Sequence, residues 1–81
     1  MSRRNEEVAA LLENIAKLLA LKGEDPFRIR AYDEAAHSVS ARSDDVEDLH
    51  RAGRLEEIPR VGPSIAAKIA AYLDSGRSAY Y

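Results

Sequence analysis

Residues 58–73 of the chain read IPRVGPSIAAKIAAYL. Pro59 and Gly62 mark its first part as a turn, and Pro63 stands where a helix can begin. The alanine-rich remainder has its apolar residues at helical spacing, so we expect a short apolar helix after the turn. The stretch therefore predicts a tight hairpin between two helices, centred on residues 58–64.

The start of that last helix is a candidate anion site. The first backbone N–H groups of a helix have no partner within the helix, and they lie at the positive end of its dipole. A phosphate can bind there through backbone amides alone. The alternative is a hairpin with a purely structural role, because proline and glycine mark the turns of many helix pairs.

The length and composition indicate one small domain that lacks a broad basic surface. The 81 residues include 12 Lys and Arg against 14 Asp and Glu, which gives a net charge of -2. Any binding of nucleic acid must therefore be local. The chain has no cysteine, so disulfides and thiolate metal sites are excluded. No apolar run approaches the roughly 20 residues that span a bilayer, and we expect a soluble, cytoplasmic monomer with no membrane partner.

The fold class follows from the apolar spacing. Alanine and leucine are abundant and no segment alternates with the period of a strand, so we expect an all-α, compact four-helix domain over residues 1–81. The first helix is predicted to begin with Asn5 as its N-cap and to end at Lys22, before Gly23. Its apolar face is expected to contain Val8, Leu11, Leu12, Ile15, Leu18 and Leu19.

A second helix is predicted from Asp25 and Pro26, which combine an N-cap with a proline at the first helical position. We expect it to continue to about Ser40. The face that it buries is expected to contain Phe27, Ala31, Ala35, Ala36 and Val39.

A third, shorter helix is predicted to begin around residues 43–45 and to be interrupted at Gly53. Asp44 and Glu47 have the spacing of a capping box at its start. Acidic residues there complement the helix dipole, which explains their number better than a metal site does. The last helix is expected to run to about Asp74 and to be stopped near Gly76. The apolar positions of the third helix and of the segment that leads to the hairpin are expected to be Val46, Leu49, Leu55 and Ile58.

Two segments together resemble a known family. The first, at residues 19–39, reads LALKGEDPFRIRAYDEAAHSV, and the second, at residues 58–76, reads IPRVGPSIAAKIAAYLDSG. In this order they resemble the N-terminal helix-hairpin-helix domain of family X DNA polymerases, the DNA polymerase beta group. The resemblance is closest to bacterial and archaeal members and covers residues 5–76.

The resemblance implies a function and a partner. In the family this four-helix domain grips backbone phosphates without reading sequence, and it holds the 5′-phosphate of the downstream strand in a short gap. The implied partner is gapped or nicked DNA with a 5′-phosphate, in base-excision or gap-filling repair, with a nucleoid association in a bacterium or archaeon. Family members continue into catalytic domains whose metal-binding aspartates are absent from these residues. We therefore expect the N-terminal part of a longer polymerase-like chain, without a polymerase active site in these residues. The alternative is a free-standing copy of the domain.

The resemblance also implies phosphate-binding residues. The amides of Gly62 and Ser64 are the implied donors, and Arg28, Arg30 and Arg60 are implied side-chain contacts. For the two arginines before the hairpin, the alternative is a solvated helix face. Arg60 stands where the family usually has a glycine. If its backbone needs a positive φ, an arginine there costs on the order of 1 kcal/mol, but its side chain could reach a phosphate.

A bound cation is implied at the same hairpin. In relatives a monovalent cation lies between hairpin carbonyls and a DNA phosphate. The matching carbonyls here belong to Glu56, Ile58 and Val61, and they would hold Na⁺ or K⁺. No other cofactor is expected.

Lys68 is a candidate nucleophile. It flanks the apolar stripe of the last helix, where partial burial would leave some free amine for Schiff-base chemistry. The resemblance implies a 5′-deoxyribose-phosphate lyase in which Lys68 attacks the sugar C1′ and Tyr32 assists. Ser64 and Phe27 replace a lysine and a histidine of the animal lyase pocket. The alternatives are a lysine whose ammonium simply reaches water and a protein-interaction domain with a structural hairpin.

The low net charge predicts how DNA binding should respond to salt. We expect weak binding of gapped duplex that falls as salt rises, with a shallow log-log slope, because only a few counterions are released at one local site. Titration of labelled gapped DNA at several salt concentrations measures this slope. A slope near that of proteins with about ten phosphate contacts would contradict a single local site.

Overall fold

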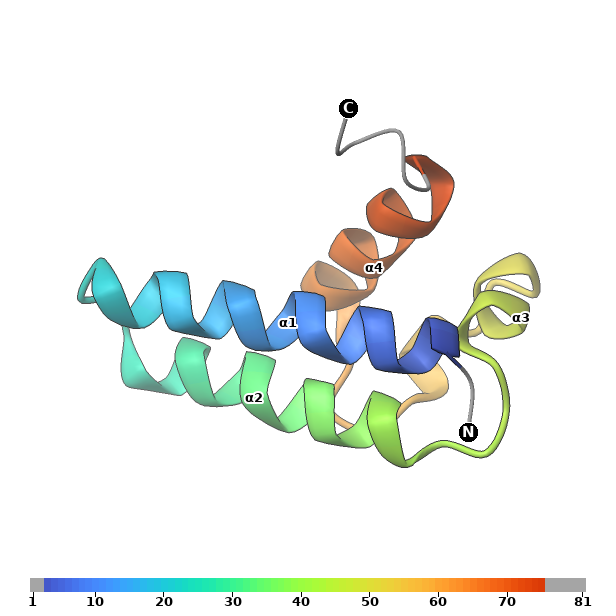
Figure 1. Cartoon of the computed structure of the whole chain (residues 1–81), viewed down its shortest axis with the longest axis horizontal. Helices are drawn as coiled ribbons and strands as arrows, with labels where there is room; N and C mark the ends of the chain where they lie inside the picture. The colour runs from blue at the N-terminus through green and yellow to red at the C-terminus, as the bar shows by residue number, and fades with distance from the viewer. Residues whose placement is uncertain (1–2, 76–81) are drawn as a thin grey trace.

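Four α-helices and one short 3-10 helix follow one another in this computed structural model, which describes residues 3–75. They are α1 (Arg3–Leu21), α2 (Pro26–Ala41), α3 (Val46–Arg51), η1 (Leu55–Glu57) and α4 (Pro63–Ser75). In Figure 1, α1 and α2 lie side by side and antiparallel, α3 lies near one end of the pair, and α4 runs at a steep angle to it. The predicted all-α fold with four helices is confirmed. The last helix ends at Ser75, within one residue of the predicted Asp74, and the predicted stop at Gly76 lies outside the described residues.

Local caps set the boundary between α1 and α2. Gly23 has a φ of 73°, and the Glu24 N–H donates to the Leu19 carbonyl at 3.0 Å. This left-handed glycine closes the end of α1 as predicted. The Asp25 carboxylate then accepts a hydrogen bond from the Phe27 N–H at 2.9 Å. The predicted N-cap of α2 is therefore confirmed.

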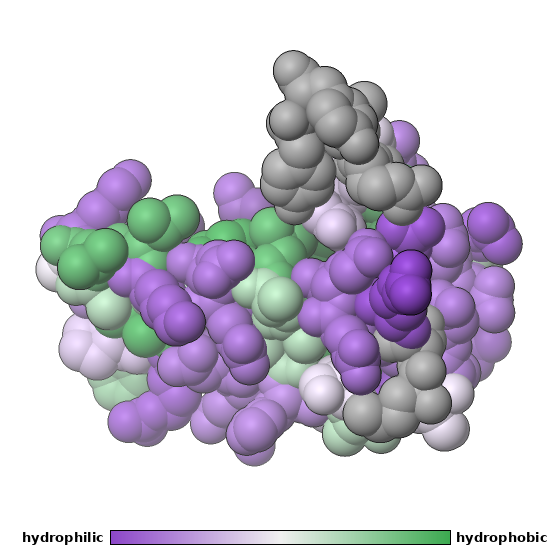
Figure 2. Space-filling model, viewed as in Figure 1, coloured by the Kyte–Doolittle hydropathy of each residue, from purple (hydrophilic) through white to green (hydrophobic). Residues whose placement is uncertain are grey.

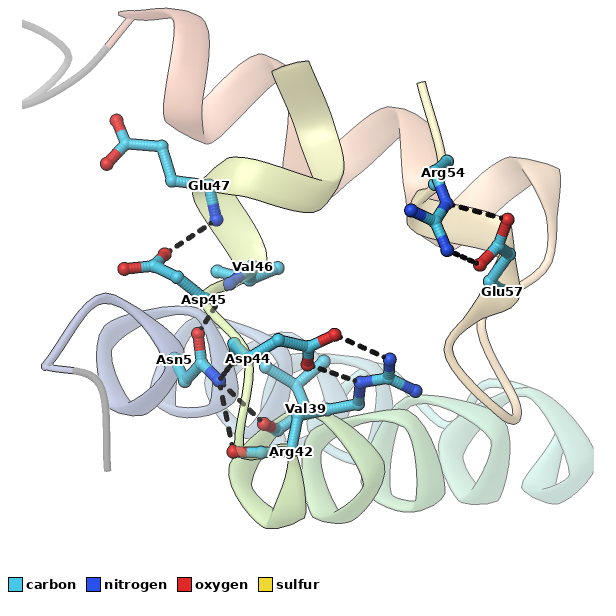
Figure 3. A network of polar contacts seen from close by, with 9 residues as sticks. All are labelled: Asn5, Val39, Arg42, Asp44, Asp45, Val46, Glu47, Arg54 and Glu57. Atoms are coloured by element: carbon cyan, nitrogen blue, oxygen red, sulfur yellow. Dashed lines mark hydrogen bonds and ion pairs between the residues drawn. The ribbon is translucent and has the colours of Figure 1, made fainter. Parts of the chain in front are cut away.

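The start of α3 differs from the prediction. Asp45 is the N-cap, because its carboxylate accepts a hydrogen bond from the Glu47 N–H at 2.8 Å. Asp44 accepts two hydrogen bonds from the Arg42 guanidinium instead, both at 2.8 Å (Figure 3). These bonds lower the pKa of the Asp44 carboxyl. The capping box predicted from Asp44 is wrong, since that side chain is used by a neighbouring arginine.

One apolar core joins all the helices. Alanines are buried on both α1 and α2, which favours close packing of these two helices. Leu55, Ile58 and Val61 carry the core into the hairpin, so the turn before α4 is anchored from within. The buried apolar residues are Val8, Ala9, Leu12, Ala16, Tyr32, Ala35, Ala36, Val39, Val46, Leu49, Leu55, Ile58, Val61, Ile65, Ala66 and Ile69.

The outer end of the α1–α2 pair is less buried than predicted. Leu18, on the apolar face predicted for the first helix, is 57% exposed. Phe27 is 78% exposed, so the burial predicted for it is wrong. None of residues 17–31 is buried, although Leu21 there is also apolar. Figure 2 shows apolar surface over the end of α1 at the left. Helical spacing identifies the apolar face of a helix, but it does not say how far along that face a third helix covers it.

Asn5 is the only buried residue with an amide or charged side chain among residues 3–75. Its predicted role as the N-cap of the first helix is wrong, because the residue lies inside α1. Its Oδ1 accepts a hydrogen bond from the Val46 N–H at 2.7 Å, and its Nδ2 donates to the Asp44 carbonyl at 2.8 Å and to the Val39 carbonyl at 3.4 Å (Figure 3). One amide thus joins α1 to the end of α2 and the start of α3.

No helix within residues 3–75 is both long and apolar enough to cross a membrane.

Replacing Asn5 by alanine should destabilise the fold by about 2–4 kcal/mol. The change leaves the Val46 N–H and the Asp44 carbonyl without this partner, and each buried unsatisfied polar group costs about 1–3 kcal/mol. Urea denaturation followed by circular dichroism measures the free energy of unfolding. The matched control is Asn14→Ala at an exposed position of the same helix, which should change stability by less than about 0.5 kcal/mol. Equal losses in the two variants would contradict the bridging role.

Candidate functional site

The N-terminus of α4 is open because its N-cap residue is a glycine. The first backbone hydrogen bond of the helix runs from the Ala66 N–H to the Gly62 carbonyl at 2.8 Å. The N–H groups of Gly62, Ser64 and Ile65 therefore have no acceptor within the helix. Aspartate side chains cap α2 and α3, whereas Gly62 has no side chain to do so. These amides are available to an anion at the positive end of the helix dipole.

Neither the backbone conformation nor the internal packing at position 62 requires a glycine. The glycines with positive φ among the described residues are Gly23 and Gly53. A Cβ atom added at Gly62 would meet no other atom within 4 Å. What the glycine does provide is space for a ligand to approach the backbone closely.

Arg60 has a left-handed backbone conformation, which the sequence alone did not decide. Its φ is 72°, and it is the only non-glycine residue with positive φ in the described part of the chain. The Val61 N–H donates to the Ile58 carbonyl at 3.1 Å and closes this turn. A left-handed conformation costs a non-glycine residue about 1–2 kcal/mol. The arginine therefore reduces stability at a position where a glycine would be relaxed.

A cavity of about 260 Å³ lies between α2 and the hairpin. It brings together Tyr32 and four of the five predicted phosphate-binding residues, from two parts of the chain that are distant in sequence. Arg30 and Lys68 are not among its lining residues. The residues that line it are Arg28, Ala31, Tyr32, Arg60, Gly62, Pro63, Ser64 and Ile65.

The hydroxyl of Tyr32 is a second group without a partner at this cavity. The residue is 2% exposed, and its hydroxyl makes no hydrogen bond within the described structure. A buried hydroxyl without a partner costs about 1–3 kcal/mol, and such groups are rare in folded proteins. Because the hydroxyl belongs to a residue of the cavity wall, a ligand oxygen in the cavity is a suitable partner.

Each arginine of the cavity has a carboxylate nearby. The Arg28 Nη1 lies 3.9 Å from the Glu24 Oε1, and the Arg60 Nη1 lies 3.8 Å from the Glu34 Oε1. Both distances are too long for a hydrogen bond. The first pair has the i, i+4 helical spacing and could have been found in the sequence. The second joins α2 to the hairpin, so no local pattern indicates it.

Lys68 is exposed, which agrees with the alternative of a lysine whose ammonium reaches water. It lies on α4 one turn after Ser64, with its apolar neighbours Ile65 and Ile69 turned into the core. Its role as a Schiff-base nucleophile stays a prediction.

The carbonyls predicted to hold a monovalent cation lie around the turn before α4. The Ile58 carbonyl already accepts the Val61 N–H, which leaves it one further lone pair. In the described part of the chain, no group of three or more histidine, cysteine, aspartate or glutamate residues could hold a metal ion. A cation at this turn would thus depend on backbone oxygen atoms, including that of Glu56.

A larger cavity, of about 540 Å³, is bordered by residues of α3, η1 and α4. Glu56 and Glu57 are among its lining residues and would repel a phosphate. The Arg54 guanidinium donates two hydrogen bonds to Glu57, at 2.9 and 2.8 Å, which lower the pKa of that carboxyl (Figure 3). Although it is larger, this cavity is the poorer anion site.

Comparisons with known proteins support the assignment of residues 58–64 as the turn of a helix-hairpin-helix motif. The helix-hairpin-helix domain family matches the chain over residues 3–78. The chain is also 30% identical over 73 residues to the DNA polymerase/3′-5′ exonuclease PolX of Bacillus subtilis (strain 168). That alignment covers 90% of this chain but 12% of the Bacillus protein. No solved structure matches the chain. The resemblance to family X DNA polymerases is confirmed.

Replacing Arg60 by glycine should stabilise the fold by about 1 kcal/mol, because glycine adopts positive φ without the steric penalty of a side chain. Thermal or urea denaturation measures the change. Arg30→Gly, at an exposed position inside α2, is the matched control and should destabilise by about 1 kcal/mol. A loss of stability in both variants would show that the backbone of Arg60 is not strained.

Proposed function

The chain belongs to the helix-hairpin-helix domain family, and from this premise we propose that it binds DNA through backbone phosphates without reading sequence. The observation that carries the proposal is the convergence of unpartnered donors on one cavity. Gly62, Ser64 and Ile65, which carry the uncapped amides of α4, line this cavity together with Arg28, Arg60 and Tyr32, whose buried hydroxyl has no partner. The similarity to the Bacillus subtilis PolX, whose name describes it as a DNA polymerase, supports DNA as the ligand that carries the phosphate.

The chemistry of the cavity suits one phosphate group. Backbone N–H groups and guanidinium groups only donate hydrogen bonds, and the tyrosine hydroxyl can donate as well. Hydrogen bonds from such donors to a phosphate are stronger than those between neutral groups. Because the donors come from both α2 and the hairpin, they can contact several oxygens of the same phosphate. One site of this kind needs no basic surface elsewhere on the molecule.

A 5′-terminal phosphate fits this arrangement better than an internal phosphodiester. A terminal phosphate carries about -1.5 to -2 charges near neutral pH and has three oxygens free to accept hydrogen bonds. A phosphodiester carries one charge and has two such oxygens. Gapped and nicked duplexes present terminal phosphates, so we propose them as the preferred DNA. Base-excision or gap-filling repair is the context in which such ends occur.

We also propose a cation site at the hairpin, formed by the carbonyls of Glu56, Ile58 and Val61. Na⁺ or K⁺ held there would lie near the uncapped start of α4 and would add positive charge beside the phosphate. The lyase activity suggested by Lys68 stays a prediction, because this exposed residue does not line the cavity. DNA binding is the function that the geometry supports best.

Tyr32→Phe should separate binding from stability. Removal of an unpartnered buried hydroxyl should leave the free energy of unfolding unchanged or raise it by about 1 kcal/mol. The ratio of the Kd for 5′-hydroxyl DNA to that for 5′-phosphate DNA should fall about tenfold or more, because one hydrogen bond to a charged phosphate is lost. Fluorescence anisotropy with gapped duplexes that differ only in the 5′ end measures this ratio.

A matched control for this variant is Tyr72→Phe. The Tyr72 hydroxyl donates a hydrogen bond to Glu7 at 3.2 Å, away from the cavity, so its removal should lower stability without changing the DNA ratio. A wild-type protein that binds 5′-hydroxyl and 5′-phosphate duplexes equally well would overturn the proposed preference. No binding of either duplex at low salt would overturn DNA as the partner.

A further inference from the structure

The positive charges at the cavity are balanced within the protein. Arg28 and Arg60 line it, and Glu24 and Glu34 lie within 4 Å of the two guanidinium groups. The local charge at the cavity rim is therefore close to zero before any ligand arrives. A ligand that uses either arginine must take it from a carboxylate.

The two ion pairs differ in what they join. Glu24 and Arg28 are one helical turn apart near the start of α2, so their contact does not depend on the hairpin. Glu34 lies on α2, whereas Arg60 lies on the hairpin, at the residue with a left-handed backbone. The second pair therefore joins the two walls of the cavity.

The contact between Glu34 and Arg60 is weak enough to be displaced. The Nη1 and Oε1 atoms are 3.8 Å apart, and the side chains are 66% and 44% exposed for Arg60 and Glu34. A phosphate oxygen can approach a guanidinium to about 2.7–2.9 Å and can accept two parallel hydrogen bonds from it. A phosphate in the cavity should therefore displace the Glu34 carboxylate from the Arg60 guanidinium.

We infer that Glu34 is an internal competitor for the phosphate. In the free protein its carboxylate holds the Arg60 guanidinium, and it releases the guanidinium when a phosphate enters the cavity. This inference rests on the proposed function, because the competing ligand is the DNA phosphate. Glu34 thereby lowers the affinity of the site and makes Arg60 available only to an anion that binds it better than a carboxylate does.

The test is the affinity of Glu34→Gln for gapped duplex with a 5′-phosphate. Glutamine keeps the size of the side chain and removes its charge, so the Kd should fall about twofold to fivefold, the range that an exposed ion pair supports. Glu13→Gln makes the same change in net charge on α1, outside the cavity lining, and should alter the Kd less than about 1.5-fold. Anisotropy titrations at one low salt concentration compare the three proteins.

A second pair of variants assigns the effect to Arg60. In an Arg60→Gly background, Glu34→Gln should no longer tighten binding, because the competitor has lost the group that it holds. Tightening of the same size in both backgrounds would mean that Glu34 acts on DNA directly, and it would overturn the inference.

The remaining outcomes separate the inference from the proposed function. If wild-type protein prefers the 5′-phosphate but Glu34→Gln binds no tighter, the competing role of Glu34 is wrong and the proposed function stands. If neither protein responds to the 5′-phosphate, both are wrong.

Discussion

The buried amide of Asn5 is the polar contact on which the arrangement of the helices depends. It pairs with backbone groups at the start of α3 and the end of α2, so three chain segments meet at one side chain. A buried amide stabilises a fold only when its donors and acceptors are satisfied, which makes this contact specific for one arrangement. Once α3 is held there, Leu55 and Ile58 can enter the core, and the hairpin that follows them is carried to the side of α2.

The cavity beside the hairpin exists because of that placement. The uncapped start of α4 is only one half of the site, and a helix N-terminus alone would not distinguish one anion from another. Tyr32 and Arg28 supply the other half from α2. The proposed site would act at the scale of a few ångströms, over which backbone amides and two guanidinium groups reach a ligand directly. The net charge of -2 describes the whole molecule and does not oppose binding at this scale.

Several features that reduce stability lie together at this cavity. Arg60 has a left-handed backbone, the Tyr32 hydroxyl is buried without a partner, and Gly62 leaves the start of α4 uncapped. Each could be relieved by a common substitution without disturbing the core. Strain and unsatisfied groups that gather at one place in a small domain are typical of a site shaped for a ligand. Elsewhere the caps and the core follow ordinary rules of stability, as Asp25, Gly23 and Asp45 illustrate.

The sequence by itself determined the helices and the hairpin, because these depend on signals that act over a few residues. Asp25 with Pro26, Gly23, and Pro63 after Gly62 each act on their own stretch of backbone, and their positions were predicted. Only the tertiary structure decided that Asn5 bridges three segments, that Phe27 is exposed and that Glu34 reaches Arg60. These facts depend on which distant segments meet, and helical spacing describes one face of one helix without naming what covers it. The residues of the proposed phosphate site were predicted from local pattern and family resemblance, whereas the cavity that several of them line results from packing.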